Sequence, residues 1–198
     1  MDNSLATTYL GLFLVLLCLA GWFVFRQVLR TRKNELTISR LEAKFKKEVG
    51  SVEEYYQLGS IYLTKKLYVQ AVNQLKKALK AAEAEISTVA VDAAKTDEDV
   101  DTSDATPIGE PLAPIYNALG YAYFGQEQFD LAIRNYKEAL KCKANYLVAM
   151  NNLAHSYERK KLMRQALETY DQVLSQDPGN DTAKRRSRSL RKQVVVSG

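Results

Sequence analysis

One 34-residue pattern is written twice in succession between Ala113 and Asn180, and this repeat constrains the fold more than any other feature. In the first copy the pattern positions hold aromatic, apolar and small residues: Tyr116, Leu119, Gly120, Tyr123, Ala132, Tyr136 and Ala139. The second copy holds residues of the same kinds at an offset of 34: Met150, Leu153, Ala154, Tyr157, Ala166, Tyr170 and Val173. A fixed period of this length is typical of stacked structural repeats, so we expect a solenoid.

Each copy also has the spacing of two helices. The first four marked residues lie at i, i+3, i+4 and i+7, which places them on one face of a helix, and the later ones mark a second helix. Gly120 and Ala132 are interpreted as small because two antiparallel helices approach closely there. Gly125 and the polar residues after it are interpreted as the turn, since glycine relaxes the backbone. This period and residue order resemble the tetratricopeptide repeat, a helix–turn–helix unit, and predict an all-α fold.

A third copy precedes these two. Ser51 and Glu54 have the spacing of a capping box and predict a helix start, and Leu58 and Gly59 then align with the Leu–Gly pair of the other copies. The three repeats are predicted at 52–85, 113–146 and 147–180. The first repeat starts 61 residues before the second, which is one 34-residue period plus 27 residues. These 27 residues form an insertion at 86–112. Its acidic, Pro- and Gly-containing composition predicts disorder, serving as a solvated loop or as a regulatory arm.

The ends of the chain predict an anchor and a cap. Residues 5–25 are uncharged and long enough to span a bilayer as a helix, so 1–34 is interpreted as a transmembrane anchor with its basic flank. The flank consists of Arg26, Arg30, Arg32 and Lys33. Residues 35–50 predict a separate amphipathic linker helix, and 181–198 a basic capping helix and tail. A cleaved signal peptide is the alternative for the first segment, but positive charge before the apolar run and a small-residue site after it are missing.

The formal net charge of +5 is unevenly distributed. Residues 26–49 carry eight Lys or Arg against three Glu, and residues 181–198 carry six against one Asp. The insertion carries seven acidic residues against one Lys, and the repeats are nearly neutral. Without a basic face that includes aromatic residues along the repeats, the charge does not argue for nucleic-acid binding. The two cysteines are interpreted as free thiols, because a disulfide would have to join the anchor to the repeats.

No residue pattern indicates catalysis. His155 is the single histidine, with no cysteine nearby in the sequence, and no Gly-rich phosphate loop occurs. We therefore expect no enzyme, no cofactor, no metal site and no small-molecule substrate. His155 is interpreted as part of the wall of a groove.

The candidate site is the concave surface that the first helices of stacked repeats form. Positions off the packing face are predicted to line it: Tyr56, Gln57, Ser60 and Leu63; Asn117, Ala118, Tyr121 and Phe124; Asn151, Asn152, His155 and Glu158. Amides can hydrogen-bond an extended peptide and aromatic rings supply apolar contact, although some of these side chains could instead pack between helices. Repeats that resemble chaperone-tail receptors use a lysine and an asparagine where Tyr56 and Ser60 stand, so binding of a C-terminal carboxylate is disfavoured.

The whole layout resembles the photosystem I assembly tetratricopeptide proteins of cyanobacteria and plastids. The resemblance is carried by the apolar span, the run from Arg26 to Arg32, Glu54 to Gly59, and Tyr116 to Tyr121. It implies a single-pass thylakoid protein with a lumenal N-terminus and with repeats on the cytoplasmic or stromal side. Its partners would be photosystem I subunits or assembly intermediates. A membrane-tethered receptor that captures soluble clients for chaperones or translocation is the alternative.

Overall fold

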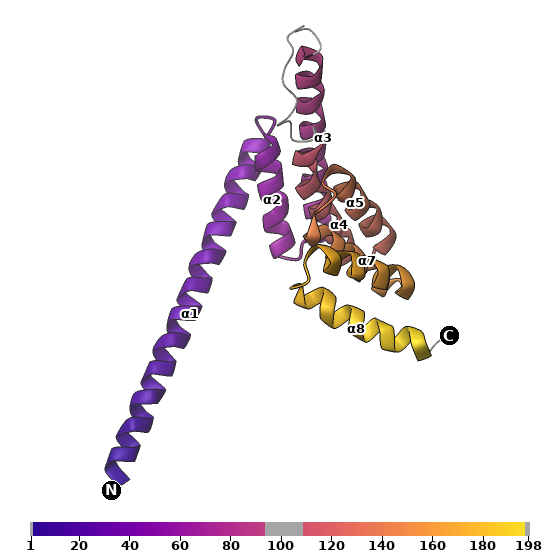
Figure 1. Cartoon of the computed structure of the whole chain (residues 1–198). Helices are drawn as coiled ribbons and strands as arrows, with labels where there is room; N and C mark the ends of the chain where they lie inside the picture. The colour runs from indigo at the N-terminus through magenta and orange to yellow at the C-terminus, as the bar shows by residue number, and fades with distance from the viewer. Residues whose placement is uncertain (1, 94–108, 197–198) are drawn as a thin grey trace. The chain divides into compact units, whose positions relative to one another are not determined.

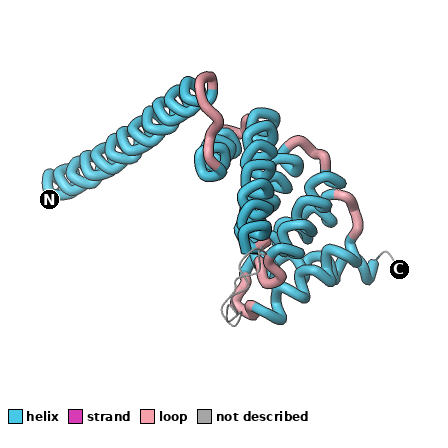
Figure 2. Tube along the Cα trace, turned by 90° about the horizontal axis from the view of Figure 1, so that it is seen from above, coloured by secondary structure: helices cyan, strands magenta, loops and turns pink. Residues whose placement is uncertain are grey.

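A computed structural model describes residues 2–93 and 109–196, and within these ranges the regular structure is helical throughout (Figures 1 and 2). The α-helices are α1 (Asp2–Phe45), α2 (Val52–Thr64), α3 (Tyr68–Ala93), α4 (Ala113–Gly125), α5 (Phe129–Cys142), α6 (Leu147–Arg159), α7 (Met163–Gln176) and α8 (Asp181–Val196), and a short 3₁₀ helix, η2, covers Glu110–Leu112. The chain divides into two compact units, Met1–Val49 and Gly50–Gly198. The predicted all-α class is therefore confirmed.

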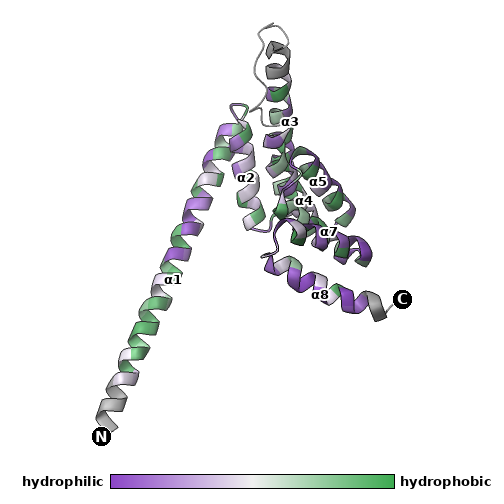
Figure 3. Cartoon of the chain, viewed as in Figure 1, coloured by the Kyte–Doolittle hydropathy of each residue, from purple (hydrophilic) through white to green (hydrophobic). Residues whose placement is uncertain are grey.

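The first unit contains one continuous helix. α1 is 44 residues long, and its N-terminal part is apolar while the part toward Phe45 is polar and charged (Figure 3). Among the described residues it is the one helix long and apolar enough to cross a membrane, which makes it a candidate span. The predicted separate linker helix at 35–50 is wrong, because α1 continues through residue 35 and ends at Phe45. No Gly or Pro stands between Arg26 and Phe45 to interrupt the helix.

The second unit is a stack of three helix pairs followed by a cap. α2 packs on α3, α4 on α5 and α6 on α7, and the second helix of each pair also contacts the first helix of the next. A small residue permits each close approach. A Cβ atom at Gly120 would lie 2.6 Å from the ring of Tyr136, and one at Gly59 would lie 2.8 Å from Leu75. In the third pair Ala154 takes the same position, and both Ala154 and Tyr170 are buried.

The turns differ from the sequence interpretation at Gly125. This glycine is the last residue of α4 and has no positive φ, whereas Glu127 two residues later has φ 60°. Lys66 and Lys161 hold the same left-handed conformation at the equivalent turns of the other repeats. Gly125 is required by contact instead, because a Cβ atom there would overlap the ring of Tyr68. The turn residue is therefore Glu127, and the glycine accommodates a neighbouring aromatic ring.

The insertion predicted as disordered is partly helical. α3 continues to Ala93 without the helix-ending proline of the third repeat, since Glu83 stands at that position, and η2 follows at Glu110. The bounds of the insertion agree with the repeats, but the predicted disorder is wrong at its two ends, 86–93 and 110–112. Residues 94–108 lie outside the described ranges. Lys143 on the loop after α5 pairs with Glu110 at 2.6 Å, and Tyr116 donates a hydrogen bond to Glu83 at 3.4 Å. These contacts fix where the chain re-enters the stack.

α8 closes the far edge of the stack. The side chain of Asn180 accepts a hydrogen bond from the backbone N–H of Ala183 at 3.0 Å and caps the helix. Ala183, Ser187 and Leu190 are buried against α7, and Arg191 pairs with Asp171 of α7 at 2.8 Å. The basic residues lie on the remaining, exposed sides. The last helix thus covers the apolar edge of the array and presents a charged surface.

The contact between Gly120 and Tyr136 predicts a large effect of substitution. Gly120→Leu should lower the free energy of unfolding by about 3 kcal/mol, because the new side chain meets a buried ring that has no free space to move into. The measurement is urea denaturation of the full chain in detergent, followed by circular dichroism. Gly179→Leu is the matched control, since Gly179 is exposed in a turn, and it should change stability by less than about 1 kcal/mol. Equal losses in both variants would contradict this account.

Candidate protein-binding groove

The predicted groove residues lie on the first helices of the three repeats. α2 carries Tyr56, Gln57 and Ser60, α4 carries Asn117, Tyr121 and Phe124, and α6 carries Asn151, Asn152 and His155. None of these nine is buried: Gln57 and Tyr121 are exposed, Tyr121 by 46%, and the others are half-buried. Ala118, which was included in the same prediction, is buried and packs within the stack instead. We call the surface formed by the nine residues the groove face; their role in binding stays a prediction.

Two asparagines join neighbouring repeats on the groove face. Asn152 donates from Nδ2 to Oδ1 of Asn117 at 3.1 Å, which links α6 to α4. Asn117 also lies close to Tyr146, which precedes α6 and is near Tyr56. Burial raises the pKa of Tyr146, and the proximity of Tyr56 raises it further, so its hydroxyl is protonated at neutral pH. This part of the face is polar and uncharged.

A second set of contacts lies toward the C-terminal ends of α4 and α6. The rings of Phe124 and His155 are 4.8 Å apart, and Phe124 also meets Phe129 edge-on at 5.5 Å. The guanidinium of Arg159 lies over both phenylalanines, 5.1 Å from the centre of Phe129 and 5.8 Å from that of Phe124. Such contacts hold a cation beside apolar rings. This part of the face is aromatic and includes a cation, Arg159, which also lies 3.4 Å from the carboxylate of Glu127.

Glu158 offsets part of this positive charge. Its side chain is 14% exposed, and its carboxylate lies 3.4 Å from the guanidinium of Arg186 on α8. Burial raises the pKa of the nearby Tyr170, and the carboxylate of Glu158 raises it further. Burial lowers the pKa of His155, and Arg186 and Arg159 lower it further, while Glu158 opposes them. His155 is therefore neutral at pH 7 and can donate or accept a hydrogen bond.

One amide oxygen on α6 lacks a partner. Asn151 donates from Nδ2 to the carbonyl of Leu147 at 3.1 Å, but its Oδ1 atom is buried and has no hydrogen-bond partner among the described residues. A buried acceptor of this kind is costly unless something donates to it. Within the described ranges no group of three or more His, Cys, Asp or Glu side chains could hold a metal ion.

Sequence reasoning missed four contributors to this surface. Tyr146 precedes α6, Phe129 begins α5, Arg159 ends α6 and Arg186 lies on the cap, so none belongs to the middle of a first helix. The available signal was the repeat offset: Arg186 stands 34 residues after Asn152 and so continues a groove position into α8. The four residues of the predicted anchor flank are exposed on α1, and their place beside a membrane stays a prediction: Arg26, Arg30, Arg32 and Lys33.

Comparison with known proteins identifies the repeats. A family model described as "Tetratricopeptide repeat" matches residues 53–85, 113–146 and 147–180, which together make up half of the chain. The chain is 34% identical over 186 residues to a Cyanophora paradoxa protein named ycf37, covering 94% of this chain and 95% of that protein. It is 31% identical to the Arabidopsis thaliana "Tetratricopeptide repeat domain-containing protein PYG7, chloroplastic", covering 98% of this chain and 57% of that protein.

Solved structures show the same fold. The TPR domain of Arabidopsis OM64 matches with a TM-score of 0.55 at 18% sequence identity, over 72% of this chain and 95% of that one. At this identity the likeness concerns the fold alone. A stack of helix pairs of this kind is a scaffold for protein–protein interaction rather than an enzyme.

The environment of His155 predicts a pH dependence of stability. Because its pKa in the folded chain lies below the ordinary value of about 6.5, the unfolded chain binds a proton more readily as the pH falls. The free energy of unfolding should therefore decrease as the pH falls from 7 through about 6.5, and level off below the folded pKa. His155→Gln should remove this decrease. The measurement is urea denaturation across this range, and an NMR titration midpoint of His155 above about 6.5 would contradict the prediction.

Proposed function

Because this chain belongs to the tetratricopeptide repeat family and, within it, to the group of ycf37 and PYG7, we propose that it is a membrane-anchored scaffold that assists assembly or stability of photosystem I. The observation that carries the scaffold role is the groove face. Its amides and aromatic rings are positioned by contacts between repeats before any partner arrives. A preorganised surface loses little conformational entropy on binding, which favours recognition of a protein segment.

The anchor restricts the scaffold to a membrane plane in this proposal. The apolar part of α1 would span the bilayer. Basic residues next to a membrane span are enriched on its cytoplasmic side, so the basic flank, and the repeats that follow it, would lie in the cytoplasm or stroma. Confinement raises the effective concentration of the groove face near membrane subunits. The thylakoid is the membrane that the family resemblance implies, and the chloroplastic relative in Arabidopsis supports it.

The link to photosystem I rests on the family resemblance and not on a contact. The proposed partners are photosystem I subunits or their assembly intermediates, held through the groove face while neighbouring subunits join. The alternative receptor for soluble clients is less well supported, since Tyr56 and Ser60 replace the lysine and asparagine of chaperone-tail receptors. In the amide–tyrosine part of the face the side chains are themselves uncharged, and the neighbouring Lys143 is paired with Glu110.

Gene deletion in the phototrophic host tests this proposal. Loss of the chain should lower the ratio of photosystem I to photosystem II under high light, and the intact gene should restore it. Tyr121→Ala removes an exposed aromatic side chain from the groove face and should restore the ratio poorly. Leu131→Ala is the matched control, because Leu131 is similarly exposed on α5 outside the groove face, and it should restore the ratio fully.

The outcomes separate the two roles. An unchanged ratio after deletion would contradict the photosystem I role, and full restoration by Tyr121→Ala would contradict the groove assignment. Purification of the full chain from membranes, followed by identification of the co-purifying proteins, distinguishes the alternative. Photosystem I subunits support the scaffold, whereas chaperones with varied soluble proteins support the receptor.

A further inference from the structure

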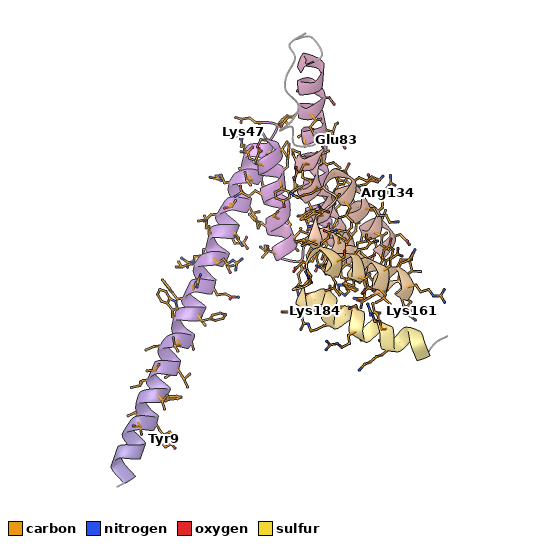
Figure 4. The ribbon with its side chains drawn as sticks, in the orientation of Figure 1. Tyr9, Lys47, Glu83, Arg134, Lys161 and Lys184 are labelled. Atoms are coloured by element: carbon orange, nitrogen blue, oxygen red, sulfur yellow. The ribbon has the colours of Figure 1, made fainter. Side chains whose placement is uncertain are left out.

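The outward side of α8 is a continuous stripe of positive charge. Successive residues of a helix are rotated by about 100°, so Lys184, Arg188, Arg191 and Lys192 project within one stripe, with Arg185 at its edge. The opposite side of α8 consists of the buried residues Ala183, Ser187 and Leu190. Arg186 lies off the stripe and pairs with Glu158 on α6. Apart from Arg191, which reaches Asp171 of α7, the charged residues of the stripe have no ion-pair contact with the described residues of the array. Figure 4 labels Lys184 on α8.

Most of this charge is not neutralised within the chain. Arg191 lies 2.8 Å from Asp171, but both side chains are more than 40% exposed, so the pair is open to solvent. The Nε atom of Arg185 donates to the backbone carbonyl of Asp181 and not to a carboxylate. In the part of the chain that the structure describes, Lys184, Arg188 and Lys192 have no acidic partner within ion-pair distance. Three of the four residues of the stripe, Lys184, Arg188 and Lys192, therefore present charge that no carboxylate of the described residues neutralises.

The composition of the stripe distinguishes between two kinds of binding partner. A protein interface contains aromatic or aliphatic side chains at its centre, and these supply most of its binding energy. From Asp181 to Gln193 the apolar residues of α8, Ala183 and Leu190, are buried in the stack and do not contribute to the stripe. A surface made of Lys and Arg alone suits a partner that is itself a broad sheet of negative charge. An anionic membrane is such a partner, because each basic residue near it adds to the attraction.

We propose that the outward stripe of α8 binds the anionic lipid headgroups of the membrane in which α1 is anchored. This inference rests on the proposed anchor, which keeps the stripe at high effective concentration near that surface. The attraction extends over about one Debye length, ~8 Å at physiological salt, so α8 needs to approach the headgroups but not insert. Binding would hold the end of the repeat stack beside the membrane.

Energy transfer from α8 to lipid headgroups tests the proposal in the full chain. A donor dye is attached through Gln193→Cys, with Cys18 and Cys142 replaced by alanine, and the chain is reconstituted into vesicles that carry acceptor headgroups. One set of vesicles contains only zwitterionic lipid and the other includes phosphatidylglycerol. Transfer should be about twofold or more higher in the anionic vesicles. Salt at about 0.5 M, with a Debye length of ~4 Å, should remove most of the difference.

Charge-matched variants show whether the stripe is responsible. Lys184→Gln, Arg188→Gln and Lys192→Gln together should abolish the difference between the two vesicle types. The control removes the same number of charges from exposed residues elsewhere in the stack, with Lys80→Gln on α3, Arg134→Gln on α5 and Arg164→Gln on α7. Figure 4 labels Arg134 on α5. The control should retain the difference.

The possible failures are distinguishable. Carbonate-resistant flotation of the reconstituted chain reports on the anchor alone, and its loss would contradict the membrane anchoring in the proposed function. Firm insertion with equal transfer in both vesicle types would overturn the lipid inference and leave the anchor standing. Transfer that increases only after a photosystem I fraction is added would also overturn it, because the stripe would then bind an acidic protein surface.

Discussion

The close approach of paired helices at one small residue per repeat is the constraint on which the rest of the structure depends. Gly59 and Gly120 let a large side chain of the second helix lie directly against the first, Leu75 and Tyr136 respectively. Ala154 and Tyr170 stand at the same two positions of the third repeat, and both are buried. The two tyrosines are only 1% exposed. When this contact sets the rotation of each first helix, it also decides which residues remain on the groove face. Packing inside a repeat and recognition outside it are therefore set by the same contact.

Contacts between successive repeats also recur at equivalent positions. Lys76 of α3 lies over the ring of Tyr123 at 6.0 Å, and one repeat later Lys137 of α5 lies over Tyr157 at 5.9 Å. The next members of the two series are Asp171 and Arg191, which form an ion pair at 2.8 Å. Equivalent positions thus join successive repeats and the cap. At the cap, Asp171 stands where the repeats have a lysine, and Arg191 stands where they have a tyrosine. This change gives α8 a contact with α7 that differs from those between the repeats.

The sequence predicted the parts of the fold that a repeat period determines. Helix pairing in the last two repeats follows from residues spaced by 34. The first copy followed from aligning Leu58 and Gly59 with the same pattern, and the cap from the need to cover the last repeat. The errors arose where no period applies. Nothing in the run from Arg26 to Phe45 marks the end of the helix, because good helix formers continue a helix whether lipid or water surrounds it. Gly125 was misread as the turn for a related reason. Its partner, Tyr68, is 57 residues away in sequence, and only the folded chain brings the two together.

The groove face could be predicted as a set of residues but not as a set of contacts. In the free chain Asn117 and Asn152 already bond to each other, so a partner must exchange that hydrogen bond for its own. Such an exchange contributes little net affinity, since bonds are lost and gained in similar number. In the proposed binding mode, the apolar surface of Tyr121 and Phe124 would supply most of the binding energy, and the amides would limit which segments fit. In this proposal the residues of the groove face differ in role: the aromatic residues control affinity, and the amides control specificity.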